Sequence, residues 1–153
     1  MFALRARGWE ISDDAIARGV AATRWAGRFE VLPRRALQPL VVVDGGHNPQ
    51  GAQALADSLA DVFPGKKVVL FSGVMADKDH PAMLRTVLPQ AAALVTVTPD
   101  NPRALPAADY AVEARRIAGE LPTVPDDLLI FAGETYEQAA RKAQELAGFD
   151  GVV

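Results

Sequence analysis

The segment from residue 40 to residue 49 reads Leu40-Val41-Val42-Val43-Asp44-Gly45-Gly46-His47-Asn48-Pro49. Its apolar first half predicts a strand that is buried on both faces of a sheet. Its second half predicts a tight connection into a helix, because Asn48 is a good N-cap and Pro49 suits the first helical position. The apolar residues that follow keep helical spacing as far as Pro64: Ala52, Leu55, Ala56, Leu59, Val62 and Phe63. A strand, a loop and a helix in this order form the unit of an α/β fold.

The same unit recurs along the rest of the chain. The pattern predicts further strands at 68–71, 94–98 and 128–132, and helices at 81–88, 107–119 and 135–146. A short strand at 29–32, which could be antiparallel, precedes them, and 150–153 begins one more strand that the chain end interrupts. We therefore expect a Rossmann-like, mostly parallel sheet of about six strands flanked by helices, with a truncated last strand. Ligands of such folds bind at the carboxyl ends of the strands, here the loops 44–48, 72–80, 98–106 and 132–135.

Residues 1–24 differ from the rest of the chain. They predict two short helical pieces around Gly8, the second capped by Ser12 and carrying Asp13 and Asp14 in its first turn. This segment is too small to form a core of its own. We expect 1–24 to be the tail of a preceding domain, and 25–153 to form the α/β domain.

Composition excludes several classes of site. The chain has 153 residues, a formal net charge of −3, no cysteine and only two histidines, His47 and His80. Without cysteine there are no disulfides or thiolate metal sites, and we predict no metal site. The negative charge gives no general attraction to nucleic acid or to an anionic membrane, and the apolar runs are too short to span a bilayer. With no signal peptide at the N-terminus, we expect a soluble, cytoplasmic protein.

The loop 44–48 is the strongest candidate site. Glycines allow the backbone to approach a ligand, and a helix N-terminus offers N–H groups and a positive dipole to an anion. Asp44 could accept hydrogen bonds from ribose hydroxyls or pair with a cation. An equally good interpretation is a tight turn in which Asn48 caps the helix and His47 is a spacer. Neither the dinucleotide fingerprint nor the P-loop pattern occurs, so the chain does not hold nucleotide phosphates in the P-loop manner.

A second candidate site is the segment Trp25-Ala26-Gly27-Arg28-Phe29-Glu30. Arg28 could present a planar fork of donors to a phosphate. By itself this signal is weak, because an arginine at the start of a strand is usually a solvated surface charge. Trp25 is more often a packing anchor than a stacking platform.

Together the two segments resemble the Mur ligase superfamily. The pattern Trp-x-Gly-Arg-x-Glu, followed by Asp-Gly-x-His-Asn-Pro, is similar to that of its folate branch, the folylpolyglutamate synthases/dihydrofolate synthases, in their C-terminal domain. Ala26 and Gly46 depart from the usual proline and alanine of the family. Further resemblances lie at 73–79 and 101–105, and 1–24 resembles the end of the family's preceding domain.

The resemblance implies an ATP-dependent ligase that activates a folate or dihydropteroate carboxylate as an acyl phosphate and joins it to L-glutamate. ATP and magnesium would be bound mainly by an N-terminal P-loop domain, over which this domain closes. Arg28 would reach the ATP phosphates, while Asp44 would contact the ribose or orient Arg28. The loop glycines Gly45 and Gly46 would let the backbone approach the nucleotide. The remaining implied roles are those of His47, the candidate catalytic residue near the incoming glutamate, and Asn48, which would cap the helix.

Two other interpretations remain open: a peptidoglycan-precursor ligase of the same superfamily, and a non-catalytic α/β binding domain. The residues Asp77-Lys78-Asp79 and Arg103 are either at the edge of the site or ordinary surface charges, with Asp79 or His80 near a helix cap. The family's last strand runs into a Gly-Ser turn, which the sequence lacks after Val153. Without that turn and without a P-loop, we expect the chain alone to have no ligase activity.

Overall fold

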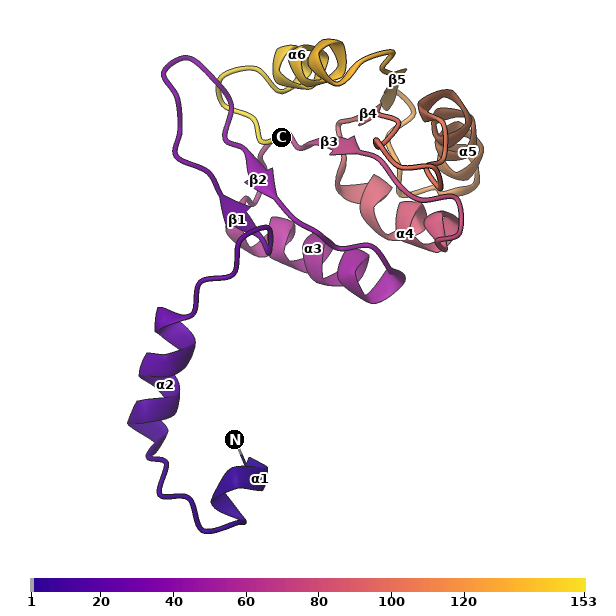
Figure 1. Cartoon of the computed structure of the whole chain (residues 1–153). Coiled ribbons are helices and arrows are strands. Elements are labelled where there is room, and N and C mark those ends of the chain that lie inside the picture. The colour runs from indigo at the N-terminus through magenta and orange to yellow at the C-terminus, as the bar shows by residue number, and fades with distance from the viewer. Residues whose placement is uncertain (1) are drawn as a thin grey trace.

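The computed structural model describes residues 2–153 (Figure 1). Its strands are β1 (Glu30–Val31), β2 (Val42–Val43), β3 (Val69–Ser72), β4 (Ala93–Thr96) and β5 (Leu129–Ala132). Its α-helices are α1 (Phe2–Arg5), α2 (Asp13–Ala22), α3 (Pro49–Val62), α4 (His80–Val87), α5 (Ala107–Glu120) and α6 (Tyr136–Ala147), and a 3-10 turn, Leu88–Gln90, follows α4. The alternation of strands and helices from β2 onward confirms the α/β class.

The strands form a parallel sheet and an antiparallel pair. The parallel sheet has the order β3-β4-β5, and β1 pairs with β2 in antiparallel fashion, as the sequence allowed. Val152 joins the two groups through isolated parallel bridges to Leu40 and to Val68. The expected single sheet of about six strands is therefore wrong in its count. Residues 150–153 contribute isolated bridges at Val152 and no assigned strand.

Helices cover both faces of the parallel sheet. Side chains of β4 alternate, so that Leu94 packs with α4 and α5 whereas Val95 packs with the alanine face of α6. Figure 1 shows α6 on one side of the sheet and α3, α4 and α5 on the other. The two apolar clusters fix the sheet between these layers, and its carboxyl edge carries the loops into α4, α5 and α6.

Helices α2, α3, α4 and α6 begin at side-chain caps, whereas α5 begins at Pro106 without one. Asn48, Asp79 and Thr135 each accept a hydrogen bond from a backbone N–H in the first turn of α3, α4 and α6. Ser12 does the same for α2, and Gly148 ends α6 with φ +66°. Because each cap satisfies a free N–H group locally, these boundaries were predictable to within a residue or two.

One expectation about burial was wrong. The run that ends in β2 was predicted to be buried on both faces, but Val42 is half-buried and Val43 is 41% exposed. β2 pairs with β1 through Glu30 and Val43, and on its other side the N–H of Val42 donates to the carbonyl of Val153.

The N-terminal segment stands away from the body (Figure 1). No residue of α2 is buried, and Trp9 and Trp25 are 63% and 74% exposed. Trp25 is thus no packing anchor in this structure. The boundary between 1–24 and 25–153 stays a prediction.

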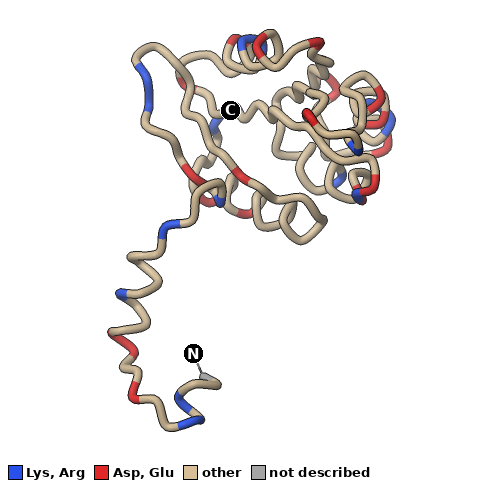
Figure 2. Tube along the Cα trace, viewed as in Figure 1, with Lys and Arg blue, Asp and Glu red and all other residues tan. Residues whose placement is uncertain are grey.

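Charged residues are spread over the described part of the chain. Figure 2 shows acidic and basic residues of the described chain interspersed along the trace rather than gathered on one face. Among residues 2–153, no helix combines the length and the apolar character needed to cross a bilayer.

Candidate functional site

The candidate site lies where the turn before β1 meets the loop from β2 to α3. Antiparallel pairing places Glu30 opposite Val43 and brings these two segments together. The N–H of Gly45 donates to the carbonyl oxygen of Gly27 at 2.8 Å, which ties the loop to the turn. A cavity of about 420 Å³ forms at this junction. All the residues predicted for the site line it: Arg28, Asp44, Gly45, Gly46, His47 and Asn48.

The carboxylate of Asp44 accepts hydrogen bonds from both sides of this cavity. One carboxylate oxygen accepts from the N–H of Phe29 at 2.8 Å, and the other accepts from the N–H of Gly46 at 2.7 Å. Phe29 has φ +43°, a left-handed conformation that is unfavourable for a side chain of its size. The bond from Asp44 supports this conformation and thereby sets the direction of the turn that carries Arg28.

A side chain on either loop glycine would meet a close neighbour. A Cβ atom on Gly45 would lie 2.6 Å from Nη1 of Arg28. A Cβ atom on Gly46 would lie 2.8 Å from the Asp44 carboxylate and 3.3 Å from the backbone of Gly51. The bare backbone thus leaves room for the guanidinium directly above the loop.

The start of α3 completes the site. The side-chain oxygen of Asn48 accepts from the N–H of Gly51 at 2.8 Å, so Asn48 is a helix cap. His47 is exposed, and its Nδ1 lies 3.0 Å from the carbonyl oxygen of Gly45. Since that oxygen can only accept, Nδ1 is the protonated nitrogen in this geometry, which leaves Nε2 for another partner.

Arg28 gives the cavity its positive charge. Its side chain is exposed and forms no ion pair within the part of the chain that the structure describes. The guanidinium and the N-terminal end of α3 line the same cavity, and both favour an anion. The arrangement can therefore bind a phosphate or a carboxylate group.

The loops that follow β3 and β4 contact each other outside this cavity. Met75 and Ala104 form an antiparallel bridge, and the Arg103 guanidinium lies 2.9 Å from the Asp77 carboxylate. Asp79 is the cap of α4. These residues do not line the cavity beside Arg28.

Some participants in the site were missed by sequence reasoning. Phe29, Gly51 and Ser58 also line the cavity. Gly51 offered a signal, because glycine is a poor helix former yet lies in the first turn of α3, against the loop at Gly46. No feature of the sequence signalled the left-handed φ of Phe29. Within residues 2–153 no group of three or more histidine or acidic side chains could hold a metal ion.

The fold and the loop define a C-terminal domain of the Mur ligase type. Residues 27–153 match the family described as Mur ligase, glutamate ligase domain, and the chain belongs to this family. The predicted family is thus confirmed.

Folylpolyglutamate synthases are among the similar proteins. The chain is 32% identical over 150 residues to the folylpolyglutamate synthase of Lacticaseibacillus casei. The aligned region covers 92% of this chain and 34% of that protein. The Mycobacterium tuberculosis folylpolyglutamate synthase complexed with ADP and AMPPCP superimposes with a TM-score of 0.76 at 32% identity, over 91% of this chain and 29% of that one. E. coli FolC in complex with DHPP and ADP has the same fold, with a TM-score of 0.79 at 23% identity, over 98% of this chain and 32% of that one. The chain thus spans about a third of the length of these relatives.

Proposed function

We propose that the chain works as the C-terminal part of an ATP-dependent ligase that adds L-glutamate to folate or dihydropteroate through an acyl phosphate. The observation that carries this proposal is the exposed Arg28 guanidinium above the Gly45-Gly46 backbone, at the start of α3. Phosphoryl transfer depends on positive groups around the transferred charge and on exact placement. The relatives with bound ADP support a nucleotide as the ligand.

Each residue of the site has a distinct part in the proposal. Arg28 binds phosphate oxygens, and Asp44 orients Arg28 through the N–H of Phe29. Gly45 and Gly46 allow the close approach of the nucleotide, and Asn48 keeps the helix start in place. His47 lies at the mouth of the cavity, where Nε2 can contact the incoming glutamate.

The cavity fits the phosphate part of ATP, because glycine backbone and guanidinium leave room that a Cβ atom would fill. ATP supplies the phosphoryl group that activates the carboxylate. Magnesium and most of the phosphate contacts belong in this proposal to an N-terminal P-loop domain, with residues 1–24 as the connection. We expect such an enzyme to be cytoplasmic, and we expect the isolated chain to have no ligase activity.

A chimera tests the proposal. The matching C-terminal region of the Lacticaseibacillus casei relative is replaced by this chain, and glutamate incorporation is measured with MgATP and dihydropteroate or folate. We expect activity in the chimera and none in the isolated chain. Arg28→Ala should lower kcat/KM by about 100-fold, the order found when a charge-stabilising donor is removed. Arg24→Ala, an exposed arginine of the N-terminal arm, is the control and should change little.

A peptidoglycan-precursor ligase is the second candidate. The chain is 30% identical over 149 residues to a UDP-N-acetylmuramoyl-L-alanyl-D-glutamate--2,6-diaminopimelate ligase of Corynebacterium efficiens. A chimera built on that enzyme and active only with its nucleotide-linked peptide would favour this function. A chain inactive in both chimeras, with the fold retained, would instead favour a non-catalytic binding domain.

A further inference from the structure

The turn that carries Arg28 is closed by a hydrogen bond of its own backbone. The N–H of Arg28 donates to the carbonyl of Trp25 at 3.3 Å, which defines a four-residue turn. Gly27, the third residue of this turn, has φ +68°, and a positive φ at that position is typical of a type II turn. A Cβ atom on Gly27 would meet nothing within 4 Å, but a side chain would be strained at this φ. The turn therefore depends on its backbone conformation and not on packing.

Glu30 adds a side-chain hydrogen bond to this turn. Its Oε2 accepts from the N–H of Gly27 at 2.8 Å, although Glu30 is exposed to solvent. The backbone of Glu30 is held in β1 by its register with Val43 of β2. The carboxylate of Glu30 thus links the turn to the first paired residue of β1.

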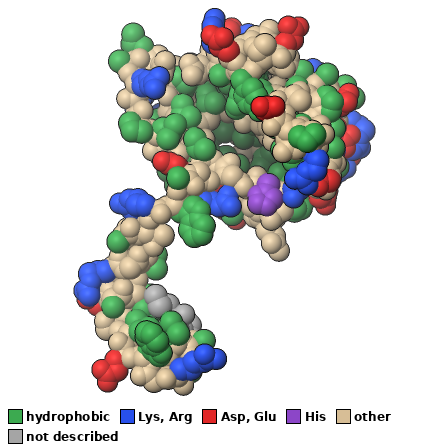
Figure 3. Space-filling model, in the orientation of Figure 1, with side chains coloured by type: hydrophobic (Ala, Val, Ile, Leu, Met, Phe, Trp, Pro, Cys, Tyr) green, Lys and Arg blue, Asp and Glu red, His purple; other side chains and the backbone are tan. Residues whose placement is uncertain are grey.

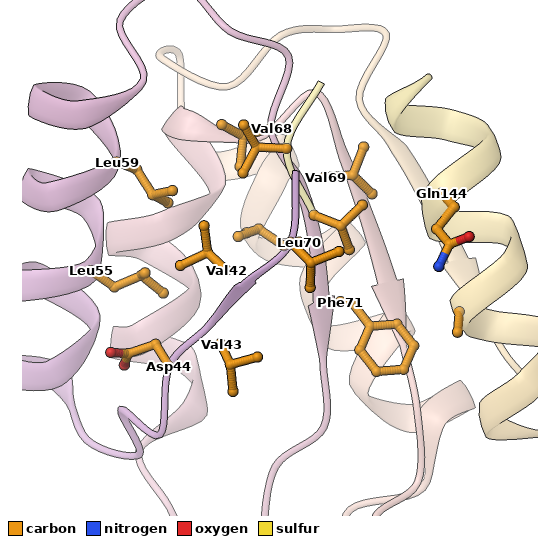
Figure 4. A pocket seen from close by; sticks show the side chains of 14 residues that line it. Val42, Val43, Asp44, Leu55, Leu59, Val68, Val69, Leu70, Phe71 and Gln144 are labelled. Carbon is orange, nitrogen blue, oxygen red and sulfur yellow. The ribbon is translucent and has the colours of Figure 1, made fainter. Parts of the chain in front are cut away.

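Carboxylates hold the backbone on both sides of Arg28. Glu30 accepts from the N–H of Gly27, the residue before Arg28. Asp44 accepts from the N–H of Phe29, the residue after it, at 2.8 Å. Figure 4 shows the carboxylate of Asp44 at the end of β2, turned toward α3 and away from β3. The two bonds together set the direction in which the side chain of Arg28 leaves the backbone.

The guanidinium itself is left free by both carboxylates. In residues 2–153, the ion pairs include neither Arg28 nor Glu30 nor Asp44. Figure 3 shows basic side chains beside a histidine at one edge of the body, open to solvent, which agrees with the exposure of Arg28 and His47. The N–H donors of the guanidinium therefore stay available for an anion.

The charge of Glu30 does not explain its place beside an anion site. Glu30 does not line the cavity next to Arg28, and its negative charge would repel an anion bound there. The hydrogen bond to Gly27 is the contribution that the geometry supports.

We infer that Glu30 is a positioning residue for Arg28: by holding the N–H of Gly27, it keeps the turn in the conformation that presents the guanidinium to the anion. The inference rests on the proposed function, in which that anion is a phosphate group of the nucleotide. Glu30 acts through Arg28 and does not touch the ligand. Because a displacement of about 1 Å can cost roughly 100-fold in rate, a loosened turn should lower kcat/KM.

Steady-state kinetics of the Lacticaseibacillus casei chimera with MgATP test this inference. Glu30→Ala should lower kcat/KM by about tenfold, and the loss should divide between kcat and KM in the same proportion as in Arg28→Ala. Glu30→Gln keeps an acceptor oxygen and should recover most of the loss. Glu145→Ala removes an exposed glutamate of α6 together with its bond to Lys142, and as the control it should change little.

A double-variant cycle shows whether Glu30 acts through Arg28. In an Arg28→Ala chimera the guanidinium is absent, so adding Glu30→Ala should cause no further loss. If Glu30 touched the nucleotide, magnesium or glutamate itself, its removal would cause the full loss in both backgrounds. Gly27→Ala disturbs the same turn through its φ, so its loss should not add to that of Glu30→Ala.

Amide hydrogen exchange measured by NMR on the 153-residue chain tests the bond independently of activity. Glu30→Ala should speed exchange at the N–H of Gly27 by about fivefold, whereas Glu30→Gln should keep most of the protection. The inference is overturned by unchanged exchange at Gly27, by unchanged kinetics of Glu30→Ala, by equal impairment of Glu30→Gln, or by a full loss in the Arg28→Ala background. An inactive parent chimera would contradict the proposed function instead, and the exchange measurement would still decide whether Glu30 holds the turn.

Discussion

Asp44 is the residue on which the site depends most, because it joins segments that are distant in sequence. Its carboxylate accepts from the backbone of Phe29 on one side and of Gly46 on the other. The sequence suggested either a nucleotide contact or an orienting role for this residue. The geometry within the chain supplies a physical basis for orientation, and a direct contact with ribose stays a prediction.

Replacing Asp44 should therefore lower the stability of the domain. Asp44→Ala leaves two N–H groups of a half-buried turn without their acceptor. We expect a loss of about 2 kcal/mol in the free energy of unfolding, measured by urea denaturation. Asp57→Ala, an exposed carboxylate on α3, is the control and should stay within about 0.5 kcal/mol of the parent chain. Equal losses for both variants would contradict a bracing role.

Two glycine substitutions distinguish an effect on the activity of the site from an effect on the stability of the fold. Gly45→Ala brings a methyl group against the flexible end of Arg28, which can move aside, and 3.3 Å from the carbonyl oxygen of Gly27, which needs a shift of only a few tenths of an ångström. Stability should therefore change by less than about 1 kcal/mol. The displaced guanidinium should lower kcat/KM of the chimera by about tenfold. In Gly119→Ala, the new Cβ meets open space on α5 and should stabilise the chain by about 0.4–1 kcal/mol. Unchanged activity of Gly45→Ala would remove Arg28 from the proposed mechanism.

At the level of elements, α3 carries the site through its first turn. Asn48→Ala removes the acceptor for the N–H of Gly51, and we expect a loss of about 1 kcal/mol in the free energy of unfolding. Calorimetric or urea unfolding measures the change. Asn48→Asp keeps the acceptor and should retain most of the stability, while Gln50→Ala controls for a surface change in the same turn. If Asn48→Ala were as stable as Gln50→Ala, capping by this side chain would be unimportant.

The helices were predictable from the sequence more closely than the strands. Helix starts carry their own chemistry, so Asn48, Asp79 and Thr135 mark them directly. A strand depends on neighbours for its hydrogen bonds and for its burial. The valine run before Asp44 correctly predicted a strand, but whether both of its faces would be covered was a property of the packing.

At the scale of the whole molecule, burial of Tyr110 links stability to pH. Tyr110 lies on the buried face of α5, in the apolar cluster with Leu84 and Leu94. Burial raises the pKa of its hydroxyl above the usual value, although a bond with Ser72 opposes the shift. The folded state thus favours the protonated form. The resulting stability is fully present below about pH 10, the unfolded pKa, and is lost as the pH rises through the folded pKa.

Unfolding measured between neutral and alkaline pH tests this linkage. Tyr110→Phe should abolish the part of the alkaline loss of stability that comes from this hydroxyl, at the expense of the bond to Ser72. Tyr136→Phe removes a half-exposed tyrosine and should leave the alkaline slope in place. A parent chain and a Tyr110→Phe variant with the same slope would show that Tyr110 does not titrate with unfolding.

From the sequence by itself followed the α/β class, the helix boundaries to within a residue or two, and the residues predicted for the candidate site. The first two rest on local chemistry, namely helical spacing and side-chain caps, and the family followed from the resemblance of two short motifs. Only the tertiary structure decided that the carboxylate of Asp44 meets the N–H of Phe29, and that Val152 lies between Leu40 and Val68. Such contacts join residues far apart in the chain. They depend on how the layers pack, and no local pattern encodes that arrangement.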